Sequence, residues 1–292
     1  MSSFRYEYAV IGGDLRQAYL LKELECRKEN VCHFALCPQA RQVCHTSYSP
    51  ALSSLEAAVT GSKRIICPIP FGKDPDCLNQ SSLKKNISLQ QVLSLLMPGQ
   101  YFFAGCIPGS FRQKALKKDV SVYDLMEDLA LAYFNTVATA EGVLCEAIRS
   151  APINLHKSRC AVLGYGKCGR ILADRLCKLS CHVTVVSSCW EELAQAALSA
   201  EEALELRMFL SHADGYDFIF NTIPAMILTK EVLMHIHPQT QILDIASSPG
   251  GVDFAAAKER NIRAVHLPGL PGRYAPLSSA RAILASIQRS ST

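Results

Sequence analysis

The chain has 292 residues, of which 49% are hydrophobic and 19% charged, and its formal net charge is +4. This composition is typical of a globular protein with a sizeable core, and the length suits two domains of about 150 residues. Lys and Arg form no run longer than two. The small and dispersed positive charge therefore argues against nucleic acid as a partner.

The N-terminal residues lack a charged-then-apolar secretory segment, and no apolar run is long enough to span a bilayer. We therefore expect a cytoplasmic protein without a membrane partner. The thirteen cysteines are odd in number and scattered, which indicates reduced thiols. The densest group contains Cys32, His33, Cys37, Cys44 and His45, but it lacks C-x-x-C spacing, so no metal site is predicted.

The first 120 residues alternate between apolar strand-like runs and helix-like segments. A strand and a glycine turn at residues 8–17 lead into a helix that continues to residue 24. Alternation of this kind indicates an α/β domain with a parallel sheet, which we interpret as an N-terminal Rossmann-like substrate or partner domain over residues 1–120. The later elements are strands at 31–36, 64–68 and 101–105, a helix at 89–96, and a polar surface loop at 71–88.

A long helix is predicted from Val122 to Ile148, because this stretch contains no proline and one glycine. Ser121 is a suitable cap, and we assign residues 121–150 to a helix that joins two domains. Its polar residues Asn135, Thr136, Thr139 and Glu141 are candidates to line a cleft. Alternatively, they interrupt an apolar stripe on a solvent-facing helix.

A second domain, residues 151–274, opens with the most informative motif. The apolar run 160–163 leads into Gly164-Tyr165-Gly166-Lys167-Cys168-Gly169 and then a helix. Glycines at this spacing permit a tight turn, a close approach of backbone amides to a pyrophosphate, and close packing of helix on strand. The motif predicts binding of a dinucleotide by Gly164, Gly166, Lys167, Cys168 and Gly169; the alternative is that the glycines serve only the turn.

The next strand, 182–186, ends in Ser187 and Ser188, where an acidic residue usually accepts the ribose hydroxyls of NAD. Two hydroxyls can instead donate to a 2′-phosphate, and Lys167 or Arg170 can supply positive charge. NADP is therefore favoured, with NAD as the alternative because the usual arginine after this strand is missing.

Two further strands, at 216–223 and 241–246, end in small polar residues. Ligands of parallel sheets bind beyond the carboxyl ends of the strands. We therefore expect Asn221, Thr222 and Pro224 to face the cofactor, and Ser247, Gly250 and Gly251 to face the substrate. A strand at 264–267 and a C-terminal helix within 275–292 complete the chain.

Six segments together resemble a known family, the A subunits of bacterial dipicolinate synthase, over nearly the whole chain. The resemblance implies two Rossmann-like domains and NADP-dependent dehydrogenation of dihydrodipicolinate to dipicolinate in the mother cell during sporulation. It also implies a partner, the flavoprotein-like B subunit, while a homo-oligomer remains open. The segments are residues 10–17, 135–142, 164–169, 221–224, 243–251 and 267–272.

A dicarboxylate substrate requires cations or amide donors. Arg16 is the first candidate, although it could instead pair with Asp14; Arg273 and Arg112 are weaker ones. Asn135 and Thr139 would line the substrate site. Glu141 is the first candidate for the base and His266 the second, and Asp244 is expected to satisfy the end of its own strand.

Two other functions remain open. One is a nucleotide-binding regulatory or scaffold subunit whose partner performs the chemistry. The other is a D-2-hydroxyacid dehydrogenase, which is disfavoured because Ser247 and Gly269 stand where that family has an arginine and a histidine.

Overall fold

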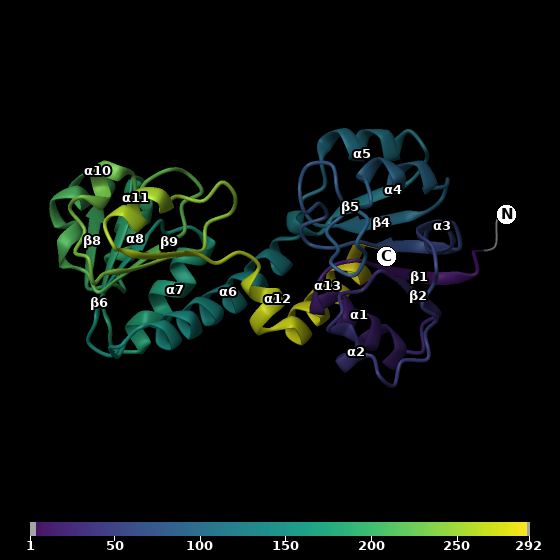
Figure 1. Ribbon diagram of the computed structural model, residues 1–292, viewed down its shortest axis with the longest axis horizontal. Helices are drawn as coiled ribbons and strands as arrows, with labels where there is room; N and C mark the ends of the chain where they lie inside the picture. Colours follow the sequence, from purple (N-terminus) through teal and green to yellow (C-terminus); the bar gives the residue numbers. More distant parts are fainter. Residues whose placement is uncertain (1–3, 291–292) are drawn as a thin grey trace. The chain divides into compact units, whose positions relative to one another are not determined.

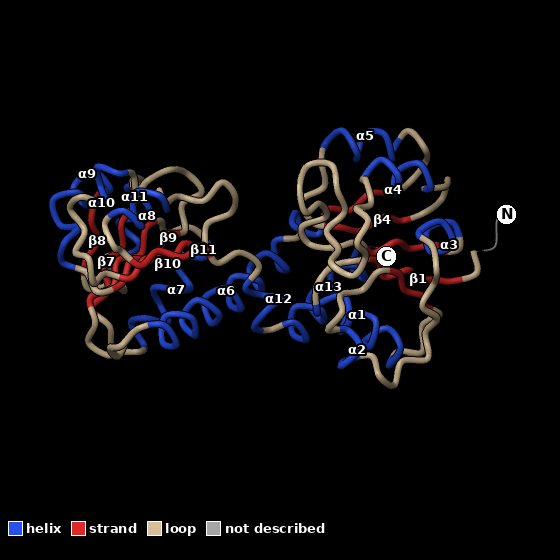
Figure 2. Tube along the Cα trace, in the orientation of Figure 1, coloured by secondary structure: helices blue, strands red, loops and turns tan. Residues whose placement is uncertain are grey.

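The computed structural model describes residues 4–290, which form two compact units. The first contains residues up to Phe134 together with those from Ala275 onward, and the second contains Asn135–Tyr274. Each unit is a parallel sheet between helices, so the predicted α/β class with two parallel-sheet domains is confirmed (Figure 2). None of the helices within residues 4–290 combines the length and apolarity needed to cross a membrane.

The first sheet has the strand order β2-β1-β3-β4-β5, and every neighbouring pair is parallel. This is one of the two common orders of doubly wound folds, with the switch point between β1 and β3. The strands are short and carry buried apolar residues on both faces, as expected where helices cover both sides. Their bounds are β1 (Tyr6–Ile11), β2 (Val31–Phe34), β3 (Ser62–Ile66), β4 (Tyr101–Ala104) and β5 (Ser121–Asp124).

Helices cover the two faces of this sheet. The C-terminal helix α13 and α1 pack on one face, around Leu20, Leu24 and Leu284, whereas α4 and α5 lie on the other (Figure 1). The first domain is therefore completed by the last segment of the chain. The helices of this unit are α1 (Leu15–Cys26), α2 (Ala40–Val43), α3 (Leu55–Thr60), α4 (Leu89–Leu95), α5 (Gly109–Leu116) and α13 (Pro276–Ser290), with a 3-10 turn η1 (Leu125–Glu127).

The second sheet has the strand order β11-β10-β9-β6-β7-β8, again fully parallel. This is the Rossmann order, with the switch point between β6 and β9, where the chain moves from one half of the sheet to the other. The strands are β6 (Arg159–Leu163), β7 (His182–Ser187), β8 (Glu202–Glu205), β9 (Phe218–Asn221), β10 (Gln241–Asp244) and β11 (Arg263–His266).

Two apolar clusters form the core of the second unit, one on each face of its sheet. The first includes residues of α6 and α7, and the second includes residues of α10 and α11. The helices are α6 (Leu129–Ser150), which begins in the first unit, α7 (Lys167–Lys178), α8 (Trp190–Ala196), α9 (Leu206–Phe209), α10 (Lys230–Leu233), α11 (Phe254–Glu259) and α12 (Leu270–Tyr274), with a 3-10 segment η2 (Leu210–Gly215).

The predicted start of the long helix at Ser121 and Val122 is wrong. These residues lie in β5, which pairs with β4, and helix α6 begins only at Leu129. The carboxylate of Asp128 accepts hydrogen bonds from the amides of Ala130 and Leu131, at 2.8 and 3.2 Å, and so caps the helix.

The segment 71–88 is irregular, as predicted, but it is not only a surface loop. Phe71, Leu78 and Ile87 are buried in the core of the first domain. The polar residues between these three side chains produced the loop-like composition, although the segment covers one face of the sheet.

Candidate functional site

The glycine turn after β6 has the geometry that the motif predicts, and each glycine has a different role. Gly164 has φ +89°, which favours glycine, and a Cβ there would lie 2.6 Å from Thr222 Oγ1. A Cβ on Gly169 would lie 2.0 Å from the carbonyl oxygen of Gly164, so only glycine lets α7 pack this closely on the turn. A Cβ on Gly166 would meet nothing within 4 Å. The turn therefore packs tightly at its ends and is open in its middle.

The open middle of the turn is also the start of α7. Gly166 is the N-cap of this 12-residue helix, and no side chain caps it. The first amides of a helix lack partners within the helix and attract anions. Lys167 and Cys168 begin the helix, and burial raises the pKa of the Cys168 thiol. These features fit the pyrophosphate of a dinucleotide on the residues around Gly166.

Thr222 links the two strands at the switch point. Its hydroxyl donates to the carbonyl oxygen of Leu163 at 2.9 Å, and its own amide donates to the same oxygen. Thr222 therefore fixes the glycine turn from β9, and its hydroxyl proton is already used within the protein. Pro224, two residues later, is exposed.

A buried carboxylate organises the carboxyl ends of β9 and β10. Asp244 is fully buried and accepts from Asn221 Nδ2 at 2.9 Å, from the Ala246 amide at 3.1 Å and from the Gly251 amide at 2.9 Å. As expected, it satisfies the end of its own strand. The predicted ligand role of Asn221 needs correction, because this side chain is fully buried and bonded to Asp244 and to Ile223.

The amides of Gly250 and Gly251 are likewise engaged within the protein. The Gly250 amide donates to Ser247 O at 2.8 Å, and that of Gly251 donates to Asp244. The predicted role of Gly250 and Gly251, as amide donors to a substrate carboxylate or to the nicotinamide carboxamide, is therefore not supported, since a donor already used in a turn is unavailable to a ligand. The side chain of Ser247 is exposed.

At the end of β7 the structure differs from the reasoning that favoured NADP. Ser187 is buried, and its hydroxyl donates to Glu192 Oε2 at 2.6 Å and accepts from the Cys189 amide at 3.1 Å. A carboxylate therefore lies at this strand end after all, although it comes from α8. Ser188 is exposed.

The two candidate bases lie in the second unit. His266 ends β11, is partly buried, and its Nε2 lies 3.2 Å from Ala246 O. Glu141 is exposed on α6. On the same helix, the Thr139 hydroxyl donates to the carbonyl of Asn135 at 2.8 Å, whereas the buried Asn135 Oδ1 has no partner among the described residues.

The three arginines considered as ligands of the substrate carboxylates are all in ion pairs. Arg16 is buried; its guanidinium bonds the carboxylate of Asp14 and donates to Ile69 O at 2.5 Å. The alternative interpretation of Arg16 is therefore the one observed, although no group within residues 4–290 accepts a hydrogen bond from its Nη1. Arg112 makes a bidentate pair with Glu127, at 2.9 and 2.8 Å.

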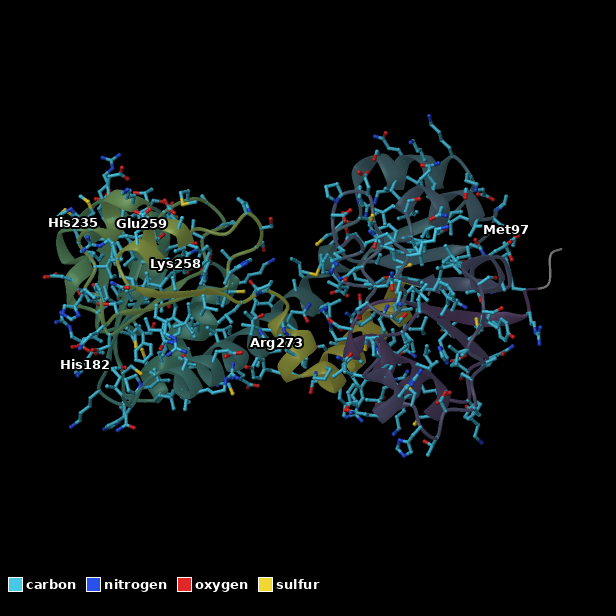
Figure 3. All side chains as sticks on the ribbon, in the orientation of Figure 1. Met97, His182, His235, Lys258, Glu259 and Arg273 are labelled. Carbon is cyan, nitrogen blue, oxygen red and sulfur yellow. The ribbon has the colours of Figure 1, made fainter. Side chains whose placement is uncertain are left out.

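Arg273, labelled in Figure 3, donates to Glu146 at 2.8 Å. Glu146 is a buried acid on α6 that the sequence reasoning did not identify. It also accepts from Tyr274 at 2.5 Å and from Arg149, and these hydrogen bonds lower the pKa of its carboxyl. The cluster holds α12 against α6, where Gly142 leaves room for the Tyr274 ring.

All thirteen cysteines are free thiols. Within the described residues, no three His, Cys, Asp or Glu side chains are placed to hold a metal ion together.

Comparisons with known proteins agree with this geometry. Residues 7–126 match the family of N-terminal domains of the dipicolinate synthase A subunit, and residues 151–257 match a family of NAD(P)-binding domains. The second match supports a nicotinamide cofactor for the second domain.

Individual relatives extend the similarity to the whole chain. The dipicolinate synthase A subunit of Bacillus subtilis (strain 168) is 28% identical over 96% of this chain and 93% of its own length. The crystal structure of the Bacillus halodurans A subunit covers 98% of this chain and 97% of that protein, with 26% identity and a TM-score of 0.82. The crystal structure of the Bacillus subtilis protein covers 99% and 97%, with 26% identity and a TM-score of 0.81. The predicted resemblance to the A subunits of dipicolinate synthase is therefore confirmed.

Proposed function

We propose that this chain catalyses NAD(P)-dependent dehydrogenation of dihydrodipicolinate to dipicolinate. A hydride leaves an sp³ ring carbon and a proton leaves its neighbour, so the ring becomes an aromatic pyridine. When bound, the nicotinamide supplies the hydride acceptor, and the products are dipicolinate, NAD(P)H and a proton. Because aromatisation favours this direction, the main task of the protein is to orient the two rings.

The observation that carries the proposal is the different environment of the three glycines. Gly164 and Gly169 are fixed by packing within the protein, whereas Gly166 borders open space at the start of α7. A turn that served only to connect β6 and α7 would not need an open glycine at its centre. The turn and the first amides of α7 would hold the pyrophosphate.

Fewer side chains are candidates to bind the substrate or to remove its proton. His266 can act as a base, because a neutral ring that donates through Nε2 to Ala246 O leaves Nδ1 to accept a proton. Glu141 is exposed and is the other candidate. In the second domain the exposed Ser247 side chain is the candidate donor to a substrate carboxylate, with Asn135 on α6. In the first domain the candidate donor is Arg16 Nη1. A flavoprotein-like B subunit is the proposed partner, in the mother cell of a sporulating bacterium.

A second candidate function, that of a regulatory or scaffold subunit, is favoured by one observation. Most polar groups at the carboxyl ends of β9 and β10 are already bonded within the protein, including Asn221, Thr222, Asp244 and both glycine amides. Such a site can bind a cofactor without reacting with a substrate.

One experiment separates the two candidates. The purified chain is titrated with NADH and NADPH, and is then incubated with the oxidised dinucleotide and dihydrodipicolinate while reduced cofactor is followed by absorbance. Formation of reduced cofactor supports catalysis by this chain. Tight dinucleotide binding by the isolated chain without turnover, with reduced cofactor formed only after the B subunit is added, supports the regulatory role. Binding of neither dinucleotide refutes both candidates.

A further inference from the structure

Glu192 lies at the point where the glycine turn and the end of β7 meet. Its Oε2 accepts from Ser187 Oγ at 2.6 Å and from the Tyr165 amide at 3.3 Å. Ser187 ends β7, and Tyr165 is the second residue of the glycine turn. Two elements that are distant in sequence therefore hold one carboxylate in place.

The second oxygen of this carboxylate is available. No residue in the described part of the chain forms a hydrogen bond to Glu192 Oε1, and the side chain is only partly buried. A carboxylate has about four acceptor positions, of which the two donors above use only part. Glu192 is thus held firmly through Oε2 and can still accept hydrogen bonds through Oε1.

In sheets with this strand order, the end of the second strand contacts the ribose of the bound dinucleotide. A carboxylate at the end of the second strand accepts the ribose hydroxyls of NAD, and it repels the additional phosphate of NADP. Here β7 is the second strand and ends in serines, but Glu192 brings a carboxylate to the same place from the first turn of α8.

We propose that Glu192 determines the choice of dinucleotide and makes NAD the preferred cofactor. This inference rests on the dinucleotide binding of the proposed function, and it reverses the preference that Ser187 and Ser188 predict. The 2′-phosphate of NADP carries a charge of about −1.5 to −2 and would have to approach the Glu192 carboxylate. Ser187 cannot compensate, because its proton is already donated to Glu192.

Two cations near the turn act in the opposite direction. Arg170 donates to Tyr165 O at 2.8 Å, with its guanidinium 5.4 Å from the centre of the Tyr165 ring, and Lys167 begins α7. Both carry positive charge on the helix that follows the glycine turn. Without the Glu192 charge, the positive charges of Arg170 and Lys167 would therefore attract a 2′-phosphate.

The test compares wild-type protein with Glu192→Gln, with Glu191→Gln as the matched control. Glu191 is the neighbouring acid; it is exposed and accepts from Cys189 Sγ rather than from the turn. The only tryptophan, Trp190, is adjacent and 72% exposed, so its fluorescence can report binding of NADH or NADPH.

We expect wild-type protein and Glu191→Gln to bind NADH more tightly than NADPH by on the order of tenfold or more, since each tenfold corresponds to about 1.4 kcal/mol and like charges in close contact cost at least that. Glu192→Gln should lose this ratio, mainly through tighter binding of NADPH. Titration with 2′,5′-ADP and with 5′-ADP isolates the effect of the 2′-phosphate. Wild-type protein should bind 5′-ADP more tightly than 2′,5′-ADP, and Glu192→Gln should lose this preference.

Wild-type protein that binds NADPH at least as tightly as NADH would overturn the inference while leaving the proposed function intact. An unchanged ratio in Glu192→Gln that still melts like wild type would overturn it too. If neither dinucleotide nor either ADP binds to wild type, the proposed function itself fails. The wild-type measurement decides the matter even if the variant does not fold.

Discussion

Gly169 and Gly166 belong to the same motif, but the structure predicts opposite effects when each is replaced by alanine. In Gly169→Ala the new methyl would lie 2.0 Å from the Gly164 carbonyl oxygen and 2.9 Å from its carbonyl carbon. Both atoms are backbone, so α7 itself must move away from β6. In Gly166→Ala the methyl meets no protein atom within 4 Å, and the residue has φ −69°, which alanine adopts easily.

The cost of Gly169→Ala can be worked from these contacts. Overpacking costs about 1–3 kcal/mol, and the upper end applies because the clash is with backbone. Alanine recovers about 1 kcal/mol through its helix propensity. The net loss of about 2 kcal/mol corresponds to a fall of about 8 °C in the melting temperature of a domain of this size. Gly166→Ala should change stability by less than about 1 kcal/mol, because two small effects oppose each other. Alanine is a slightly poorer N-cap than glycine, but it lowers the conformational entropy of the unfolded chain and so favours the folded state.

Calorimetry of the full chain measures stability, and Trp190 fluorescence measures dinucleotide affinity. We expect Gly169→Ala to lower the transition of the second domain, and Gly166→Ala to retain it but to weaken binding of the dinucleotide at least tenfold, about 1.4 kcal/mol. The reasoning would be refuted if Gly166→Ala melted as early as Gly169→Ala, or if it bound the dinucleotide as tightly as wild type.

Three other substitutions test the packing of the two domains. Because hydrogen bonds from Tyr274 and Arg149 lower the pKa of Glu146, its carboxylate stabilises the folded state above the pKa of the unfolded chain, and this contribution is lost as the pH falls through the folded pKa. Glu146→Gln should therefore cost about 1–3 kcal/mol at pH 7 and progressively less below about pH 4, as measured by denaturant unfolding across pH; a penalty independent of pH would contradict the role of the charge. Asp244→Asn should lower the free energy of unfolding of the second domain by about 3 kcal/mol, because the amide cannot accept from three donors at once; a wild-type calorimetric transition would show that the network is dispensable. Leu284→Ala should destabilise only the first domain, by about 2–5 kcal/mol, and hydrogen exchange should show faster opening in α1 but not in α7.

The features that depend on local pattern could be predicted from the sequence. The β6 strand, its glycine turn and α7 are contiguous, and their residue types fix their conformation. Val122 shows where this reasoning fails. The four residues of β5 form an edge strand that, within residues 4–290, pairs only with β4, and no local signal distinguishes such a strand from the first turn of a helix.

Long-range contacts explain the remaining differences at the site. Glu192 is five residues beyond Ser187, and only the turn of the chain into α8 brings its carboxylate back to the strand end. The amides of Gly250 and Gly251 appeared free because the sequence does not show that Asp244 and Ser247 accept from them. An acidic residue in the first turn of the helix after the second strand is the signal that could have found Glu192.

The return of the chain to its first domain has a consequence for synthesis on the ribosome. The apolar face formed by Leu20, Leu21 and Leu24 is covered by α13, which is synthesised after the whole second domain. At 5–20 residues per second, translation of residues 135–292 takes about 10–30 s. The second domain is one continuous segment and can fold during this time. The apolar face of the first domain stays exposed until α13 is available to cover it. Nascent-chain aggregation and the need for chaperone binding should therefore concentrate on the first domain, although it is the first to emerge.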